Sequence, residues 1–217
     1  MLTAFLVATL AFQEHAAWER FAPGSWVELR TTGTRSGQPV KEIVKTSFKN
    51  VTELELVLLV ETTDTAGGRG HLEMKFPLPQ RAAPKEEEGT KLGQEDLLLE
   101  GKTFACEVRE RRGTRRWITT GVKANGGVLK SEAISGTVKV LSRVLKLEEK
   151  VRVGSATVTC WVREDVTETP DQKTTRTHWM SDEVPGGLVR MEMRQSRGKE
   201  RIEETETTLT SFEIVKK

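Results

Sequence analysis

The side chains with the clearest chemical potential are five arginines around one glycine, Gly113. The alternating residue pattern predicts a hairpin tip here, and the cluster consists of Arg109, Arg111, Arg112, Arg115 and Arg116. Guanidinium groups bind carboxylate, sulfate and phosphate through charge and paired hydrogen bonds. In an exported protein such a cluster could bind an acidic envelope polymer or lipid headgroups. The commoner role of charge at this position is to keep a sheet edge soluble and closed to further strands.

Other polar residues lack the spacing of a catalytic or metal site. None of His15, His71 and His178 has a second His or Cys at metal-ligand spacing. His71 and His178 are expected on strands, opposite the apolar residues and exposed to solvent. Glu110 and Glu164 close two strands, where a pair of carboxylates is conceivable, but charged strand ends are commoner. No phosphate-binding loop or nucleophile elbow is present. We therefore predict no catalytic residues, no metal and no cofactor.

An internal repeat sets the architecture. WMSDEVPGGLVRME (Trp179–Glu192) is similar to WITTGVKANGGVLKSE (Trp117–Glu132), and both are typical of a strand, a tight turn and a return strand. In the later copy Pro185 and Gly186 suit the two central positions of a type II turn, which Gly187 then closes. Upstream, residues 95, 106 and 110 match residues 149, 160 and 164 at a constant offset of 54. We therefore predict that a β unit is duplicated.

The repeat also bears on the two cysteines, Cys106 and Cys160, which hold equivalent positions on apolar strand faces. An exported chain with two cysteines invites a disulfide. Equivalent positions in successive four-strand units would lie roughly 19 Å apart in a flat sheet, whereas a disulfide needs Cα atoms within about 7 Å. We predict two buried, reduced thiols.

Period-two alternation recurs from residue 25 to the last strand, and no long amphipathic helix is predicted. The fold class is therefore all-β: an antiparallel meander of about twelve strands, built from repeated four-strand units. Because no helices are available to cover its apolar face, the sheet should curl into a barrel or a two-layered sandwich. We expect a first β unit at residues 15–79, a linker at 80–91, a second unit at 92–145 and a third at 146–217.

Composition narrows the class of protein and its location. A net charge of +2 from 34 basic and 32 acidic residues argues against a dedicated nucleic-acid binder. The apolar run Leu2–Phe12 is too short to span a bilayer and favours a secretory signal within residues 1–14. A buried N-terminal strand or helix is the alternative. We expect a chain that is exported, periplasmic or secreted, and not membrane-spanning.

Several motifs resemble a family of uncharacterised exported bacterial β proteins. The resemblance lies in GSWVELRTT (Gly24–Thr32), in the G-x-x-x-x-C-x-x-x-E segment Gly101–Glu110, and in an opening W-x-x-F-x-x-G-S-W-V and a closing W-x-S-x-E-V-P-G-G-L-V. It covers most of the chain from Trp18 onward and implies an antiparallel β fold and export, with no assigned activity. A looser similarity of topology connects such chains to lipoprotein carriers of the LolA type, which hold lipid against a curved sheet. Those proteins contain helices that this sequence lacks.

Repeated architecture without a convergent polar site favours a non-enzymatic exported module that binds or interacts with an unidentified ligand. The alternative is a carrier of an apolar ligand, such as a lipid or lipoprotein acyl chain, within the curved sheet. A third possibility is an envelope hydrolase. A large apolar cavity would favour the carrier, and a filled core would favour the binding module.

Overall fold

The computed structural model describes residues 15–52, 55–64, 66–77 and 89–215. Most of them lie in strands. The helices in this described part are short: α2 (His15–Trp18) and the 3-10 turn η1 (Ala124–Gly127). The segment at residues 1–14, interpreted as a signal, lies outside the described residues, as does most of the predicted linker. The all-β prediction is confirmed.

Thirteen strands are present in the described ranges. The first four are β1 (Trp26–Arg35), β2 (Gln38–Val51), β3 (Glu55–Thr63) and β4 (Arg69–Pro77). The next five are β5 (Thr90–Leu99), β6 (Lys102–Arg111), β7 (Thr114–Ile118), β8 (Val128–Ser135) and β9 (Val138–Val153). The last four are β10 (Ala156–Glu168), β11 (Gln172–Met180), β12 (Leu188–Arg197) and β13 (Glu200–Glu213). The boundary that we place between residues 145 and 146 falls inside β9.

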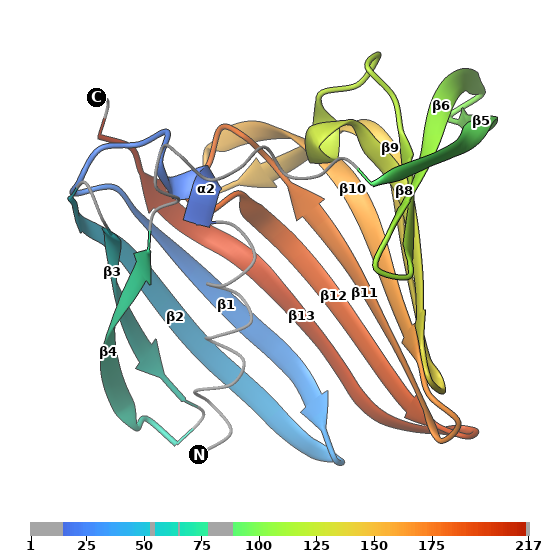
Figure 1. Cartoon of the computed structure of the whole chain (residues 1–217). Coiled ribbons are helices and arrows are strands. Elements are labelled where there is room, and N and C mark those ends of the chain that lie inside the picture. The colour runs from blue at the N-terminus through green and yellow to red at the C-terminus, as the bar shows by residue number, and fades with distance from the viewer. Residues whose placement is uncertain (1–14, 53–54, 65, 78–88, 216–217) are drawn as a thin grey trace.

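All thirteen strands form one antiparallel sheet (Figure 1), in the order β4-β3-β2-β1-β13-β12-β11-β10-β9-β8-β7-β6-β5. Two meanders, β1 to β4 and β5 to β13, are joined side by side. The joint is the pairing of β1 with β13, which runs from Trp26 opposite Glu213 to Arg35 opposite Glu203. Strands β4 and β5 follow one another in the chain yet form the two edges of the sheet.

This connection shows why the sheet must curl. The chain from Pro77 to Thr90 can span at most ~47 Å when fully extended. Thirteen strands in a flat sheet would place the edge strands ~58 Å apart. The sheet therefore bends and brings its edges toward one another, as Figure 1 shows. The predicted curled meander is confirmed, and it remains one open sheet: β4 and β5 are not paired with each other in the described ranges.

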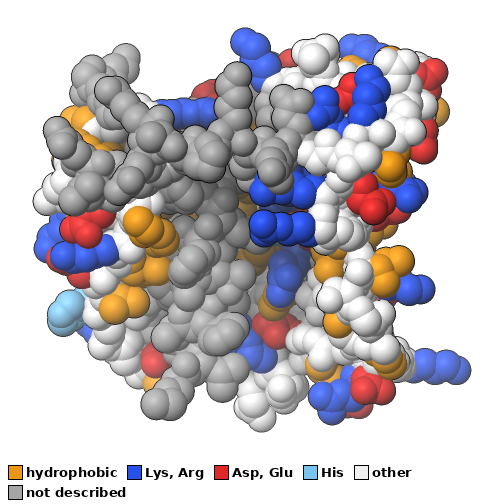
Figure 2. Space-filling view, in the orientation of Figure 1, with side chains coloured by type: hydrophobic (Ala, Val, Ile, Leu, Met, Phe, Trp, Pro, Cys, Tyr) orange, Lys and Arg blue, Asp and Glu red, His pale blue; other side chains and the backbone are white. Residues whose placement is uncertain are grey.

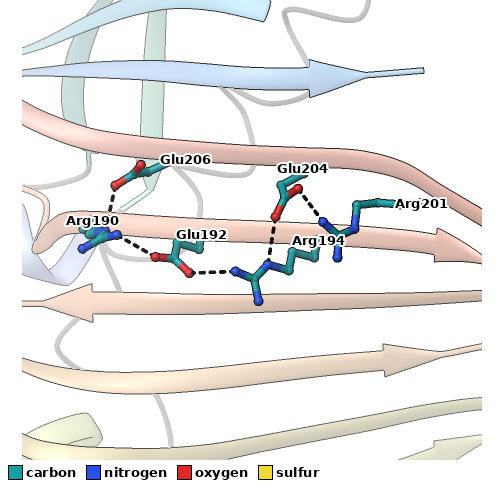
Figure 3. Close-up of polar contacts among 6 residues, drawn as sticks. All are labelled: Arg190, Glu192, Arg194, Arg201, Glu204 and Glu206. Carbon is teal, nitrogen blue, oxygen red and sulfur yellow. Dashed lines mark hydrogen bonds and ion pairs between the residues drawn. The ribbon is translucent and has the colours of Figure 1, made fainter. Parts of the chain in front are cut away.

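The curvature gives the sheet a concave and a convex face. Directly paired residues of antiparallel strands share a face, and successive residues of a strand alternate between faces. Figure 3 looks onto Arg190, Glu192 and Glu206, with the first strands of the sheet behind them. These residues therefore lie on the convex face. Their chain neighbours Met191 and Thr207, which are paired with each other, lie on the concave face and are buried.

Two hydrophobic clusters form the core. The larger one joins the strands on both sides of the β1–β13 pairing and includes Trp18 of α2, which packs edge-on against Phe48 with 6.3 Å between ring centroids. The smaller cluster lies among β5 to β9 and includes Cys106, Val108 and Trp117. Both cysteines are buried and free, in agreement with the expected reduced thiols.

The predicted turn at residues 184–187 closes over α2. Gly187 N donates to Val184 O at 2.9 Å, and Gly186 has φ +74°, the left-handed value that a type II turn requires at this position. A Cβ atom at Gly186 would lie 2.9 Å from Trp18 Nε1. The turn therefore needs glycine both for its backbone and for its packing.

The two hairpins with similar sequences contain the same tryptophan–glutamate contact. Trp117 Nε1 donates to Glu95 Oε2 at 2.7 Å, and Trp179 Nε1 donates to Glu149 Oε1 at 3.0 Å. In both cases the hydrogen bond passes over one intervening strand, β6 or β10. A basic side chain from the next strand covers each ring: Lys130 lies 4.3 Å from the centroid of Trp117, and Arg190 lies 4.8 Å from that of Trp179. These matching contacts support our proposal of duplication.

Candidate functional site on the concave face

A continuous polar strip crosses the concave face. Its residues pair directly from strand to strand, from β11 to β6, in the order Arg176, Asp165, Ser142, Ser131, Arg116 and Arg109. We call these six residues the concave strip. Directly paired side chains are neighbours on one face, so the strip is one surface although its residues come from six strands.

Rows of concave residues flank the strip on both sides. On one side Arg163 pairs with His178, and His178 pairs with Met191. On the other side Thr167 pairs with Val140, and Arg111 pairs with Thr114. Between β5 and β11 these rows and the strip hold more cations than carboxylates. The cations are Lys91, Arg109, Arg111, Arg116, Arg163 and Arg176, and the carboxylates are Glu107 and Asp165. Figure 2 shows Lys and Arg side chains lining the visible hollow.

The five candidate arginines do not form one patch. Arg112 and Gly113, both with positive φ, make the two-residue turn between β6 and β7. Pairing and alternation place Arg109, Arg111 and Arg116 on the concave face, and Arg115, which pairs with Glu110, on the convex face. The hairpin thus divides the cluster between two surfaces and leaves Arg112 at the tip.

Carboxylates neutralise part of this cluster. Glu107 is shared by Arg109 and by Lys91, whose Nζ lies 2.5 Å from Glu107 Oε2. The hydrogen bonds from Lys91 and Arg109 lower the pKa of Glu107, so this carboxylate stays ionised. Arg115 lies 3.6 Å from Glu110 on the convex face. These pairs account for two of the five arginines.

Arg116 and Arg176 differ, because neither forms an ion pair with any residue that the structure describes. Arg116 is exposed and Arg176 is half-buried. The convex face of β12 and β13 shows the opposite arrangement (Figure 3). There Arg190 lies 2.9 Å from Glu206, Arg194 lies 3.2 Å from Glu204, and Arg201 lies 2.6 Å from the same Glu204. These three convex arginines are paired, whereas Arg116 and Arg176 of the concave strip are not. Arg30, on the convex face of β1, also lacks an ion pair with a described residue.

Asp165 is the one acidic residue of the concave strip. Arg163 Nη2 and His178 Nε2 both lie 3.2 Å from its Oδ2. Burial alone would raise the pKa of Asp165, but the approach of His178, the charge of Arg163 and the Ser142 hydroxyl outweigh burial and lower it. His178 Nε2 is buried and not aligned for a hydrogen bond to a described residue. The charge of Arg163 therefore neutralises Asp165, which leaves Arg176 without a partner among the described residues.

The prediction that His178 is exposed is wrong, because only 3% of its surface is accessible. Alternation correctly places it on the face opposite Trp179, but in this part of the curled sheet both faces are buried. His71 on β4 is exposed, as predicted.

A second ionic group lies farther along the concave face. Arg35 Nε donates to Glu203 Oε1 at 2.8 Å, and Arg35 Nη1 lies 3.6 Å from Glu42 Oε1. Burial tends to lower the pKa of Arg35, but the two carboxylates more than reverse this and raise it. The Nη2 atom is buried without an acceptor among the described residues. Two carboxylates balance this arginine, so this end of the face lacks the excess positive charge found near β7.

The remaining candidates do not assemble a reactive centre. Glu110 and Glu164 pair with arginines on separate strands, Arg115 and Arg143. No group of three or more His, Cys, Asp or Glu residues able to hold a metal occurs in the described ranges. Burial, followed by the charges of Glu149 and Glu183, raises the pKa of Cys160 to about 12, so its thiol stays protonated at neutral pH.

One cleft of about 350 Å³ lies between the two related turns. Its lining includes acidic groups together with Cys160 and Trp161. It is an open cleft, not an enclosed apolar cavity.

No helix among the described residues is long and apolar enough to cross a bilayer.

Sequence reasoning found the hairpin arginines but missed the other members of the concave face. Alternation within β11 already places Arg176 and His178 on one face. The strand pairing that lines them up with Arg116 is a property of the whole sheet, and local patterns do not specify it.

Comparison with known proteins yields distant structural similarities, with TM-scores of 0.41 and below. No family model matches the chain, and no curated protein matches it. A solved structure of a protein named as exported, with a YmcC-like fold, from Bacteroides fragilis has 13% identity and a TM-score of 0.41, over 89% of this chain and 98% of that one. A lipoprotein from Parabacteroides distasonis has 14% identity and a TM-score of 0.40, over 89% and 99%. The hypothetical lipoprotein YmcC from Escherichia coli has 13% identity and a TM-score of 0.31, over 99% and 97%.

Proposed function

We propose that this chain is a non-enzymatic, exported binding module whose ligand lies against the concave face of the sheet. The observation that carries the proposal is the concave strip, in which Arg116 and Arg176 have no ion-pair partner among the described residues. Polar and charged side chains on a concave surface are the usual means of orienting a ligand. On the convex face of β12 and β13, by contrast, Arg190, Arg194 and Arg201 pair with glutamates.

An apolar ligand fits this surface less well. Ser131, Ser142 and Thr167 are half-buried polar residues on the concave face. An apolar chain laid over them would offer no hydrogen bonds, and burying an unpaired polar group costs about 1–3 kcal/mol. The concave strip therefore favours a polar ligand over the lipid carried in the alternative function.

The test blocks the strip without changing its charge. Ser131 lies in the middle of the strip, and its neighbour Glu132 points to the convex face of the same strand. We expect Ser131→Trp to weaken binding about tenfold or more and Glu132→Trp to leave it nearly unchanged. The probes are immobilised heparin, neutral dextran, polylysine, and vesicles of anionic or zwitterionic phospholipid.

The proposal is wrong if the parent protein binds none of these probes, or if both tryptophan variants bind equally. Turnover of an envelope polysaccharide or peptide by the parent would replace the binding module with an enzyme. Fractionation of the native host checks export, because recovery of the chain with the cytoplasm would contradict it.

A further inference from the structure

We infer that the ligand of the concave face is an acidic polysaccharide, whose anionic groups bind Arg116 and Arg176 and whose hydroxyls bind the residues between them. This inference rests on the proposed function, because it names the ligand class of the same surface.

The positions of the two arginines indicate an extended anionic ligand. Arg116 lies on β7 and Arg176 on β11, four strand spacings or ~19 Å apart across the sheet. Neither pairs with a described carboxylate, whereas Arg190, Arg194 and Arg201 on the convex face of β12 and β13 do. A half-buried guanidinium gains most from a carboxylate or sulfate that makes two hydrogen bonds with it. Two separated cations on one strip suit a chain that carries repeated negative charges.

The residues between the two arginines suit a ligand with hydroxyl groups. Ser131 and Ser142 occupy the strip itself, and Thr167 lies in the adjacent row. A hydroxyl side chain both donates and accepts hydrogen bonds, and the Asp165 carboxylate accepts them. All four side chains are half-buried, so a ligand can still reach them. Acidic groups and hydroxyls occur together, at repeated intervals, in acidic polysaccharides.

The shape of the surface favours a chain over a membrane. The strip lies on the concave side of a curled sheet (Figure 1). A flat bilayer would meet the rim of the sheet before its headgroups reached the strip, whereas a single polymer chain can enter the hollow. Binding of anionic vesicles through these arginines is therefore the competing outcome of the test.

The experiment uses two double variants with the same change in charge. One replaces the strip arginines, Arg116→Gln with Arg176→Gln. The control replaces Arg30 on the convex face and Arg112 at the hairpin tip, Arg30→Gln with Arg112→Gln, and neither of these has an ion pair with a described residue. Heparin is the probe, and affinity is measured by calorimetry at several salt concentrations.

We expect the strip variant to bind heparin about tenfold more weakly or worse, and the control to bind within about twofold of the parent. Binding by the parent should weaken as salt rises. An Arg116→Lys and Arg176→Lys variant should recover part of the affinity, because lysine keeps the charge but loses the paired hydrogen bonds. Melting temperatures establish that all variants are folded.

The inference is overturned by equal loss in the strip variant and the control, or by a parent that does not bind heparin. Vesicle binding that depends on the strip arginines, without heparin binding, would assign the surface to a membrane. If Ser131→Trp blocks a neutral or cationic probe while heparin is not bound, only the ligand class is wrong and the binding module stands.

Discussion

Glycine is required at position 186 both by the backbone conformation of the turn and by packing against Trp18. Its φ of +74° is unfavourable for any residue with a Cβ atom, and a Cβ there would lie 2.9 Å from Trp18 Nε1. Gly113 has nearly the same φ, +75°, but the nearest atom to its added Cβ is Ile134 O at 3.9 Å. The two glycines therefore separate backbone strain from steric clash.

We predict that Gly186→Val destabilises the protein more than Gly113→Val. Backbone strain should cost about 1 kcal/mol in both variants. Overpacking against the buried Trp18 should add about 1–3 kcal/mol in the first. Urea denaturation of the two variants beside the parent checks this. Equal urea midpoints for the two variants would mean that α2 can shift to accommodate the valine side chain without a cost in stability.

The contribution of Asp165 to folding stability should depend on pH. Because the pKa of Asp165 is lowered in the folded protein, the ionised carboxylate stabilises the fold at pH values above its unfolded pKa. That contribution is lost as the pH falls through the lowered folded pKa. We predict that Asp165→Asn costs about 1–3 kcal/mol at pH 7 and much less near pH 3. Denaturation at both pH values measures the difference, and the same loss at pH 3 would show that Asp165 acts by shape alone.

At the scale of elements, the two tryptophan–glutamate contacts act across three strands each. We predict that Trp117→Phe and Trp179→Phe lose similar stability, about 2 kcal/mol or more, because each leaves a glutamate without its indole donor and opens space in the core. Trp26→Phe is the control. Trp26 also donates to a carboxylate, Glu213 at 2.8 Å, but this pair is exposed, so its loss should cost about 0.5 kcal/mol or less.

Thermal and urea unfolding of the three variants measure these losses. A large loss in only one of the two buried variants would show that the related hairpins support the sheet in different ways.

The sequence was most informative about the individual strands. Residues 27, 29 and 31 of β1 are buried while residues 26, 28 and 30 are more exposed, as their alternation predicts. Strand existence follows from local patterns, and so does the φ of Gly186. Face assignment is harder, because alternation says that His178 and Trp179 point in opposite directions but not that both become buried. The concave strip depends on the pairing of six strands, which no single stretch specifies.

At the scale of the whole molecule, one pairing holds the sheet together. Strands β1 to β4 contact the other meander through β13, whose concave residues Thr205, Thr207 and Leu209 are buried. We predict that deleting residues 200–217 abolishes cooperative unfolding, instead of merely lowering stability, because both meanders then lose their shared neighbour.

Circular dichroism and urea denaturation check the deletion. A truncated chain that keeps one sharp transition with an unchanged dependence on urea would contradict this, because the two meanders would then still unfold as one unit without β13. A chain shortened only at residues 216–217 is the control, because it keeps Val215, which hydrogen-bonds to Ala22 and Ser25.

Strand β1 has two neighbours in the sheet, β2 and β13. The second lies more than 160 residues farther along the chain, since Arg35 is opposite Glu203. During synthesis on the ribosome, the first four strands would emerge long before β13 exists. Until then β1 presents an unpaired edge of backbone donors and acceptors, which other chains can join. Contacts this distant in sequence also form slowly. The pairing that completes the sheet is thus available only after nearly the whole chain has been made, a timing that suits the export that we propose.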